Sequence, residues 1–447
     1  MNLNHFFKFL VIVLSLALSN QSFSNSSDSR FSEARYKAGY AQVDISPVVN
    51  KDKVQVLAGG QKLVTKISDP LYAKAVFLTE QHNKVAIISI DTIGFFSNSH
   101  EQLTKDVKAL IAKHVKLNQL ILVNTHTHSG VIPDNKFQQL AQSLSQLVLN
   151  AKKQAVLVKI GASTTQFNQA YKRIVNHNGK AKMLWSNPQR VTTEAADMPL
   201  GVINIVHAKD HKPFITLVNY NAHPVITMNR FDAVVSADYP GYMAHYIKQN
   251  YGSQTLFLPG AAGDINPFDA GTSDAIGKSP APALKQADKL GKLLASKVIK
   301  QIKQTNDYKQ QGRLALQSIN MPVVSAISCD IKQQSPNSLC DKSNQLYAQI
   351  NTLTINDDIA IATFPGEYFS DFGHQLRQHL QRLRPNQFKH SFFVGYSNGN
   401  LGYVPTLAAL KLGGYGAEKS KMHFSYDTGH QHIKAAAESL VKIVSHQ

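Results

Sequence analysis

Apolar runs and amphipathic stretches alternate along almost the whole chain. Short β-branched runs bounded by polar residues are typical of buried strands, and apolar residues repeating every three or four positions are typical of helices. The predicted strands are 37–45, 73–78, 84–90, 120–123, 156–160, 213–220, 255–258, 314–324, 347–363 and 391–396. The predicted helices are 102–114, 136–154, 239–249, 283–304, 368–383 and 431–445. This order predicts an α/β fold in which mixed β-sheets are flanked by helices.

Other patterns concern the organisation of the chain. The alternation in 37–45 is typical of a strand at the edge of a sheet, and the runs 73–78 and 84–90 predict a hairpin. The stretch 166–198 is rich in Asn, Arg and Lys and has no clear period, and irregular stretches of that length tend to be functional loops. The chain has no Ser/Pro/Gly-rich linker and no internal repeat, so we expect one large domain.

Polar side chains follow several of the predicted strands. His126 and His128 come directly after 120–123 and are two positions apart, so on an extended backbone both imidazoles point to one face. Further strand ends carry His223, Asp264, Glu367 and, in a loop, Tyr403. Because α/β folds build their sites at strand ends, we expect these residues to meet. Two imidazoles and a carboxylate suit a catalytic Zn²⁺; incidental histidines at a strand end are the alternative.

The N-terminus has the pattern of a secretory signal peptide. Residues 1–24 contain Lys8, the apolar run 9–18 and a small-x-small cleavage site, Ser22-Phe23-Ser24. The apolar run is too short to span a bilayer, so we expect cleavage and a secreted or periplasmic protein. An uncleaved N-terminal anchor is the alternative. The polar residues 25–36 predict a disordered segment.

The chain is basic, with a formal net charge of +18, of which the predicted signal peptide carries one charge. Such a charge favours anionic partners. The chain has no recognisable nucleic-acid motif, so an anionic membrane surface or envelope polysaccharide is a better candidate than nucleic acid. Because the lysines are scattered rather than clustered, a role in solubility alone is the alternative.

The chain has two cysteines, Cys329 and Cys340. Neither has His or Cys partners nearby at the spacing of metal ligands, and in an exported protein we expect a disulfide between them. The bridge would close a polar loop.

Six short motifs occur in the order found in the neutral ceramidases. They are Gly39-Tyr40 with Asp44-Ile45-Ser46-Pro47, Thr125-His126-Thr127-His128-Ser129-Gly130, Ala222-His223-Pro224, Gly263-Asp264-Ile265-Asn266-Pro267, Pro365-Gly366-Glu367 and Gly402-Tyr403-Val404. The chain therefore resembles this family of zinc-dependent amidases, which cleave N-acylsphingosine into fatty acid and sphingosine. The resemblance covers about residues 38 to 420 and implies that 37–447 is a zinc hydrolase domain.

The resemblance also implies roles for individual residues. It implies one Zn²⁺ per chain, held by His126, His223, Glu367 and Tyr403. The catalytic residues that it implies are His128, Asp264, Arg173 and Tyr403. In this scheme His128 is the acid/base or carbonyl-polarising group, Asp264 holds the attacking water, and Arg173 contacts the substrate. The substrate would be a lipid amide.

Each of these residues also has a purely structural explanation, which stays open. The alternatives are a buried, hydrogen-bonded imidazole for His223, a favourable charge at a helix N-terminus for Glu367, a turn cap for Asp264 and a packed aromatic ring for Tyr403. Asp91 and Asp238 would either orient a ligand imidazole or cap a turn.

The chain departs from the family pattern at three places. Asn266 stands where the family has a serine proposed as nucleophile or water partner, and an asparagine side chain does not attack. The glycine-rich continuation of the histidine motif is replaced by Val131-Ile132-Pro133. The family also has a C-terminal immunoglobulin-like domain, which we expect this chain to lack. Alternatives to ceramide hydrolysis are a zinc amidase or esterase with another acyl substrate, and a non-catalytic lipid-binding envelope protein.

Overall fold

A computed structural model describes most of the chain from Arg35 to Ser445. The described residues are 35–56, 60–81, 83–95, 99–130, 137–187, 189–191, 197–228, 234–270, 280–323, 346–418 and 427–445. The predicted signal peptide at 1–24 and the predicted disulfide between Cys329 and Cys340 lie outside these residues.

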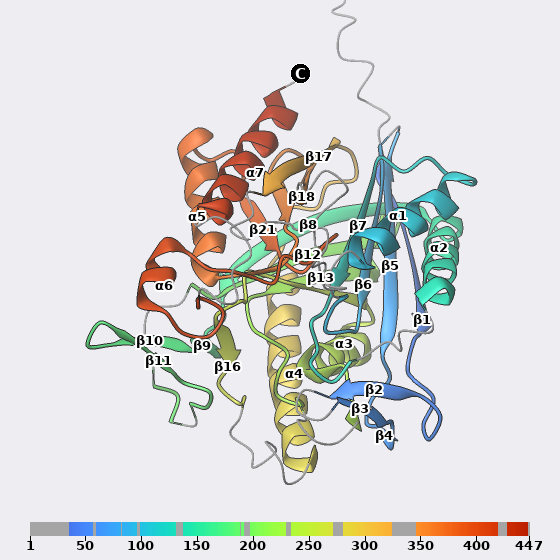
Figure 1. The fold of residues 1–447 in the computed structure, drawn as a ribbon. Coiled ribbons are helices and arrows are strands. Elements are labelled where there is room, and N and C mark those ends of the chain that lie inside the picture. Colours follow the sequence, from blue (N-terminus) through green and yellow to red (C-terminus); the bar gives the residue numbers. More distant parts are fainter. Residues whose placement is uncertain are drawn as a thin grey trace, which may run out of the picture. The chain divides into compact units, whose positions relative to one another are not determined.

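An eight-stranded mixed sheet is the largest element of the fold (Figure 1). Its order is β15-β13-β12-β8-β1-β5-β6-β7, in which β13–β15 and β6–β7 are parallel and the other pairs antiparallel. The strands are β1 (Lys37–Asp44), β5 (Tyr72–Glu80), β6 (Asn83–Ile90), β7 (Gln119–Asn124), β8 (Val156–Gln166), β12 (Pro199–His207), β13 (Pro213–Tyr220) and β15 (Gln254–Pro259).

A second sheet has four strands in the order β17-β18-β19-β21. They are β17 (Leu314–Val323), β18 (Leu346–Ile355), β19 (Ile359–Thr363) and β21 (His390–Val394). β19 and β21 are parallel, whereas the other two pairs are antiparallel. The mixed sheets that the sequence predicts are therefore confirmed.

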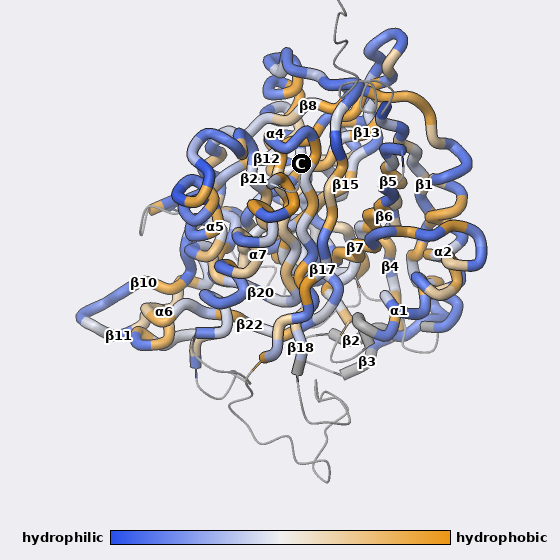
Figure 2. The backbone as a smooth tube through the Cα atoms, turned by 90° about the horizontal axis from the view of Figure 1, so that it is seen from above, coloured by the Kyte–Doolittle hydropathy of each residue, from blue (hydrophilic) through white to orange (hydrophobic). Residues whose placement is uncertain are grey.

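The two sheets pack face to face, and helices cover their outer faces (Figure 2). Helices α1 and α2 pack on the β1-β5-β6-β7 part of the large sheet, α3 and α4 on its β12-β13-β15 part, and α5 and α7 on the small sheet. The helices are α1 (Ser99–Ala112), α2 (Phe137–Lys153), α3 (Asp238–Tyr251), α4 (Pro280–Lys303), α5 (Ser370–Leu383), α6 (Leu407–Leu412) and α7 (Thr428–Ser445).

Side-chain alternation along the strands fills both core layers. In β12, Ile203 and Ile205 face the small sheet, whereas Leu200 and Val202 face the helices. Successive side chains of a strand point to opposite faces, so a strand covered on both faces is apolar throughout. This explains the continuous apolar runs in the sequence.

Three parallel strand pairs, β6–β7, β13–β15 and β19–β21, determine where the loops meet. Parallel neighbours end at the same edge of a sheet, and backbone hydrogen bonds join their ends. Asn124 N donates to Tyr396 O (3.1 Å), Gly395 N to Pro259 O (2.9 Å) and Gly260 N to Tyr220 O (3.0 Å). The segments after these strands therefore lie together, as the sequence predicts for its polar strand ends.

Short strands occupy the connecting segments. They are β2 (Lys53–Val56), β3 (Gly60–Leu63), β4 (Lys66–Ile67), β9 (Ala170–Lys172), β10 (Ile174–His177), β11 (Lys180–Met183), β14 (Val234–Val235), β16 (Ile265–Pro267), β20 (Glu367–Tyr368) and β22 (Tyr403–Val404). Among the residues that the structure describes, none of the helices combines the length and apolar character needed to cross a bilayer.

Several local predictions are wrong. β1 is an internal strand, because it pairs with β8 as well as with β5. The stretch 166–198 is partly regular, since β9, β10 and β11 form in it through pairings with each other and with β16. Tyr36, assigned to a disordered segment, is fully buried, and its hydroxyl donates to Asn356 Oδ1 (2.8 Å).

Gly201 of β12 lies where the two sheets come close, and a Cβ there would overlap the ring of buried Phe392 in β21. We expect Gly201→Ala to lower the free energy of unfolding by about 1–3 kcal/mol, because overpacking forces the ring to move. Denaturant unfolding of G201A, F392L and the double variant measures this. The double variant should lose less stability than the two single losses added together; strict additivity would contradict the contact.

Candidate functional site

Three histidines from two loops meet at the edge where the parallel strands end. His126 and His128 follow β7, and His223 follows β13. Their ligand nitrogens lie within 4.8 Å of one another, with His126 Nε2 and His128 Nε2 3.2 Å apart. His126 is 5% exposed and His223 is fully buried. The predicted meeting of these side chains is confirmed.

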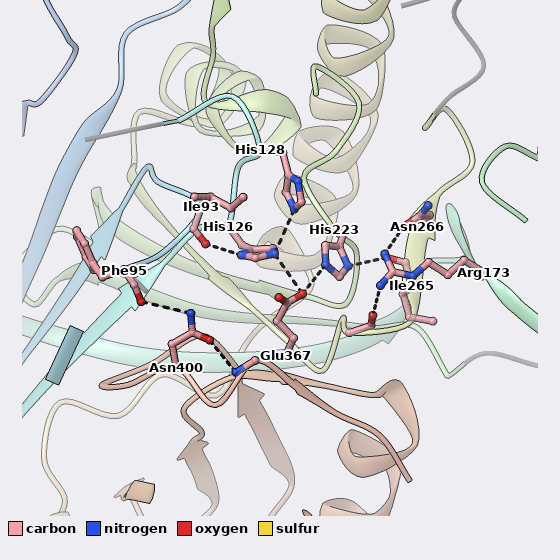
Figure 3. A network of polar contacts seen from close by, with 12 residues as sticks. Ile93, Phe95, His126, His128, Arg173, His223, Ile265, Asn266, Glu367 and Asn400 are labelled. Atoms are coloured by element: carbon pink, nitrogen blue, oxygen red, sulfur yellow. Dashed lines mark hydrogen bonds and ion pairs between the residues drawn. The ribbon is translucent and has the colours of Figure 1, made fainter. Parts of the chain in front are cut away.

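Glu367, from the segment that follows β19 of the small sheet, joins the histidines (Figure 3). Its Oε2 atom lies 3.0 Å from His223 Nε2 and 3.3 Å from His126 Nε2. Glu367 precedes helix α5 by three residues and lies in β20, which pairs with β22, so the helix predicted from 368 begins later. Its backbone N–H donates to Gly402 O (2.8 Å), which places the carboxylate.

Backbone carbonyls fix the tautomers of two imidazoles. His126 Nδ1 lies 2.5 Å from Ile93 O, and His223 Nδ1 lies 3.2 Å from Ile265 O. A carbonyl only accepts hydrogen bonds, so both Nδ1 atoms carry the proton and both Nε2 atoms present lone pairs. Ring nitrogens anchored in this way are typical of metal-ligating histidines. Carbonyls, rather than Asp91 or Asp238, therefore orient these two rings.

The protonation of the cluster suits a divalent cation. Burial lowers the pKa of His223 to about 4, so its ring is neutral at neutral pH. Burial alone would raise the pKa of Glu367, but His126 and His223 outweigh it and hold that pKa well below its usual range. Two acceptors 3.0 Å apart need a proton or a cation between them, and these pKa directions disfavour the proton. The donor set therefore fits a metal ion held by His126, His223 and Glu367.

His128 is the third imidazole of the cluster and a further candidate ligand. Its Nδ1 is buried, and the part of the chain that the structure describes offers it no hydrogen-bond partner. Burial, together with His126 and His223, lowers the pKa of His128 well below its usual range. His128 is therefore neutral at neutral pH.

The backbone of His126 reaches this arrangement by an unexpected route. Its φ is 65°, which lies in the left-handed region. The sequence-based expectation that His126 and His128 share one face assumed an extended backbone, and the backbone at His126 is not extended. Such a conformation costs about 1–3 kcal/mol and persists at sites where surrounding contacts determine it. The ring of Tyr396 is one such contact, with its centre 4.2 Å from that of His126 and the planes inclined by 30°.

Tyr396 is a residue of the site that the sequence patterns missed. It follows β21, is 5% exposed and has a φ of 53°. Burial, followed by the charge of Glu367, raises the pKa of Tyr396 well above its usual value, so the phenol is protonated. Tyr396 is the last residue of the predicted strand 391–396, a position at a strand end like those that identify His126 and His223.

Arg173 lies between β9 and β10 on the far side of His223 from His126 (Figure 3). The side chain is 3% exposed, and Nη2 donates to Gly263 O (2.7 Å). Three aromatic rings surround the guanidinium carbon, those of Tyr415, Tyr403 and Trp185 at 5.2, 5.5 and 5.9 Å. Tyr415 and Trp185 are further site residues that the sequence patterns missed.

Asn266 is buried beside Arg173. Its Oδ1 accepts a hydrogen bond from Arg173 Nη1 (3.4 Å). Its backbone pairs with Tyr171 through β16 and β9, which brings the two loops together. Asn266 therefore positions the arginine.

Tyr403 approaches Glu367 through the backbone pairing of β22 with β20. Its ring packs edge-on against Tyr415, with ring centres 5.4 Å apart, as well as against Arg173. A role of its hydroxyl as a metal ligand stays a prediction.

The carboxylate of Asp264 contacts the start of helix α5. It accepts hydrogen bonds from Ser370 N (2.7 Å) and Ser370 Oγ (3.1 Å), one on each oxygen. Burial raises the pKa of Asp264, and the charge of Lys172 opposes this. Both oxygens thus have partners at the helix N-terminus, where a carboxylate is favourable. A catalytic role of Asp264 stays a prediction.

Asp91 and Asp238 also hold backbone. Asp91 Oδ2 accepts from Tyr72 N (3.0 Å), and Asp238 Oδ2 accepts from Thr227 N (2.7 Å). Thr227 O in turn accepts from Ser129 Oγ (2.7 Å), so Asp238 supports the loop that carries His128.

We expect Asp264→Ala to lower the free energy of unfolding by about 1–2 kcal/mol, because the N–H of Ser370 loses its partner. Asp44→Ala is the matched control, since Asp44 accepts from Ser46 N at the exposed end of β1. It should cost a few tenths of a kcal/mol. Equal losses in the two variants, measured by denaturant unfolding, would contradict the capping role.

No family model and no curated protein sequence matches the chain. Solved structures do match it. A neutral ceramidase from Pseudomonas aeruginosa superposes with a TM-score of 0.72 and 14% identity, covering 92% of this chain and 75% of its own. A ceramidase complexed with C2 has the same TM-score and identity and is covered to 76%. The resemblance that the sequence motifs indicate is confirmed in three dimensions: this chain has the fold of the neutral ceramidases.

Proposed function

We propose that this chain is a zinc-dependent hydrolase of the neutral ceramidase family, cleaving the amide bond of an N-acyl lipid, with ceramide as the first candidate. One observation carries the proposal: His126 Nε2 and His223 Nε2 face Glu367 Oε2 at 3.3 and 3.0 Å, with both Nδ1 atoms held by carbonyls. The fold likeness supports the reaction class.

The donor set fits one Zn²⁺ per chain. His126, His223 and Glu367 would hold it, and Tyr403 would complete the set. Three protein ligands that leave an open position are typical of catalytic zinc. When bound, zinc lowers the pKa of a water to about 7 and polarises a carbonyl oxygen.

Amide hydrolysis requires a proton to move within the site. The oxygen of a water adds to the acyl carbon, the C–N bond breaks, and the leaving nitrogen gains a proton. His128 is suited to accept the proton from the water and return it to the nitrogen, because its Nδ1 has no partner among the described residues. A carboxylic acid and an amine result.

Arg173 and Asn266 shape the side of the site where the substrate lies. Asn266 holds Nη1 of Arg173, and the three surrounding rings restrict the guanidinium. The arginine is thereby preorganised to bind a substrate oxygen. Because Asn266 offers no nucleophile, water attacks the acyl carbon directly.

We also propose that the protein is exported and meets its substrate at an anionic membrane surface. The N-terminal pattern and the formal net charge of +18 support this. Trp185 is 48% exposed, and its ring centre lies 5.9 Å from the guanidinium carbon of Arg173. A half-exposed tryptophan suits the interface between water and lipid.

Metal analysis of the purified protein should find about one zinc per chain. We expect His223→Ala to weaken zinc affinity at least about 100-fold, because it removes a ligand and not only its support. His177→Ala, which alters an exposed histidine, is the matched control and should retain the metal. Full zinc occupancy in H223A would contradict the assigned centre.

Fluorescent N-acylsphingosine tests the reaction itself. We expect fatty acid release by the wild type and H177A, and background rates after chelation or in His126→Ala, because both treatments empty the centre. Release that survives chelation would contradict zinc dependence. A zinc-loaded protein that leaves ceramide intact would contradict this substrate and direct the search to other acyl amides and esters.

A further inference from the structure

The hydroxyl of Tyr396 is buried and has no hydrogen-bond partner among the residues that the structure describes. The whole side chain is 5% exposed, so bulk water does not solvate it. A buried hydroxyl without a partner costs about 1–3 kcal/mol. Buried polar groups are usually paired, so this exception needs a physical reason.

The surroundings of Tyr396 place it at the candidate metal centre. Its ring stacks on His126 at 4.2 Å and meets His223 edge-on, with ring centres 6.2 Å apart. The charges of Glu367, Tyr403 and Arg173 act on its hydroxyl. The phenol therefore lies among the residues assigned to the metal and the substrate.

The backbone holds this side chain firmly. Tyr396 N donates to Gly366 O (3.1 Å), and Tyr396 O accepts from Asn124 N (3.1 Å). Tyr396 thus links the segment before Glu367 to the end of β7, just before His126. Its φ of 53° is costly for an aromatic residue. A strained, doubly held residue with an unpaired donor is typical of a preorganised site.

The chemistry of the centre indicates what the hydroxyl binds. His126 Nε2, His223 Nε2 and Glu367 Oε2 are acceptors committed to the cation, and a phenol that keeps its proton is a donor. A ligand that completes the centre must therefore bring an acceptor oxygen. In acyl transfer that oxygen gains negative charge in the transition state, where a fixed donor stabilises it most.

We propose that Tyr396 is a catalytic hydrogen-bond donor whose hydroxyl binds the acyl oxygen of the substrate as charge develops on it. The inference rests on the proposed hydrolase function and adds to it a residue that the six sequence motifs do not include. The donor acts on the His126 side of the centre, whereas Arg173 acts beyond His223.

Tyr396→Phe removes the hydroxyl and keeps the ring on His126. Tyr36→Phe is the matched control: this tyrosine is buried as well, but its hydroxyl lies within hydrogen-bond distance of two acceptors, Arg313 O (3.0 Å) and Asn356 Oδ1 (2.8 Å). We expect Y396F to lower kcat about 100-fold with little change in KM or zinc content, and to leave Tm unchanged or raised. Y36F should lower Tm by about 1–3 °C and leave kcat unchanged.

Binding of dodecanoate supplies a readout that does not require turnover. Its carboxylate has an acyl oxygen, so calorimetric titration of the zinc-free and zinc-loaded proteins should give about 5–10-fold weaker binding in Y396F than in the wild type. Y36F should bind like the wild type.

The outcomes separate the two proposals. Normal kcat and normal dodecanoate affinity in Y396F, with an active wild type, would overturn the role of Tyr396 and leave the hydrolase intact. Weaker dodecanoate binding by Y396F in a protein that hydrolyses no acyl amide or ester would keep the contact and overturn the hydrolase. A Tm loss in Y396F equal to that of Y36F would mean that the hydroxyl is paired, which would also overturn the inference.

Discussion

Two backbone carbonyls determine what the centre of this fold can bind. Ile93 O and Ile265 O take the Nδ1 protons of His126 and His223, so both Nε2 lone pairs face Glu367. A carbonyl does not titrate, and the tautomers it imposes persist wherever the rings are neutral. The ligand geometry therefore depends on the loop backbones and needs no further ionisable residue beside these two rings.

Those loop backbones depend in turn on the sheets. Ile93 follows β6, and its N–H donates to Gly130 O, which ties it to the loop after β7. Ile265 O accepts from His223 N as well as from His223 Nδ1, so the β16 segment holds both the backbone and the ring of one residue. The parallel pairing of β6 with β7 and of β13 with β15 brings these segments together. Changes at the sheet interface would therefore reach the histidine cluster through the backbone.

The sequence predicts the layers of the fold well and the local geometry of the site less well. Apolar periodicity locates β7, β13 and α4 because these elements bury continuous or one-sided apolar faces. It misses β12, whose neighbouring irregular stretch hides its start, and it cannot distinguish the internal strand β1 from an edge strand, since pairing partners are distant in the sequence. His126 is located at the centre, but its left-handed backbone depends on contacts with Tyr396 and Ile93 that no local pattern encodes.

Some hydrogen-bond donors of the site already have protein acceptors, and others do not. Arg173 donates from Nη1 to Asn266 and from Nη2 to Gly263. Its Nε and the Tyr396 hydroxyl, in contrast, are buried without hydrogen-bond partners among the described residues. A serine at 266 would have offered a nucleophile on the arginine side; the asparagine offers an acceptor that satisfies the arginine instead. Two unsatisfied donors thus flank a set of acceptors that suits a cation. A ligand with acceptor oxygens would pair both donors and so remove the free-energy cost of leaving each one buried without a partner. Ligand binding and the stability of the folded site are therefore coupled.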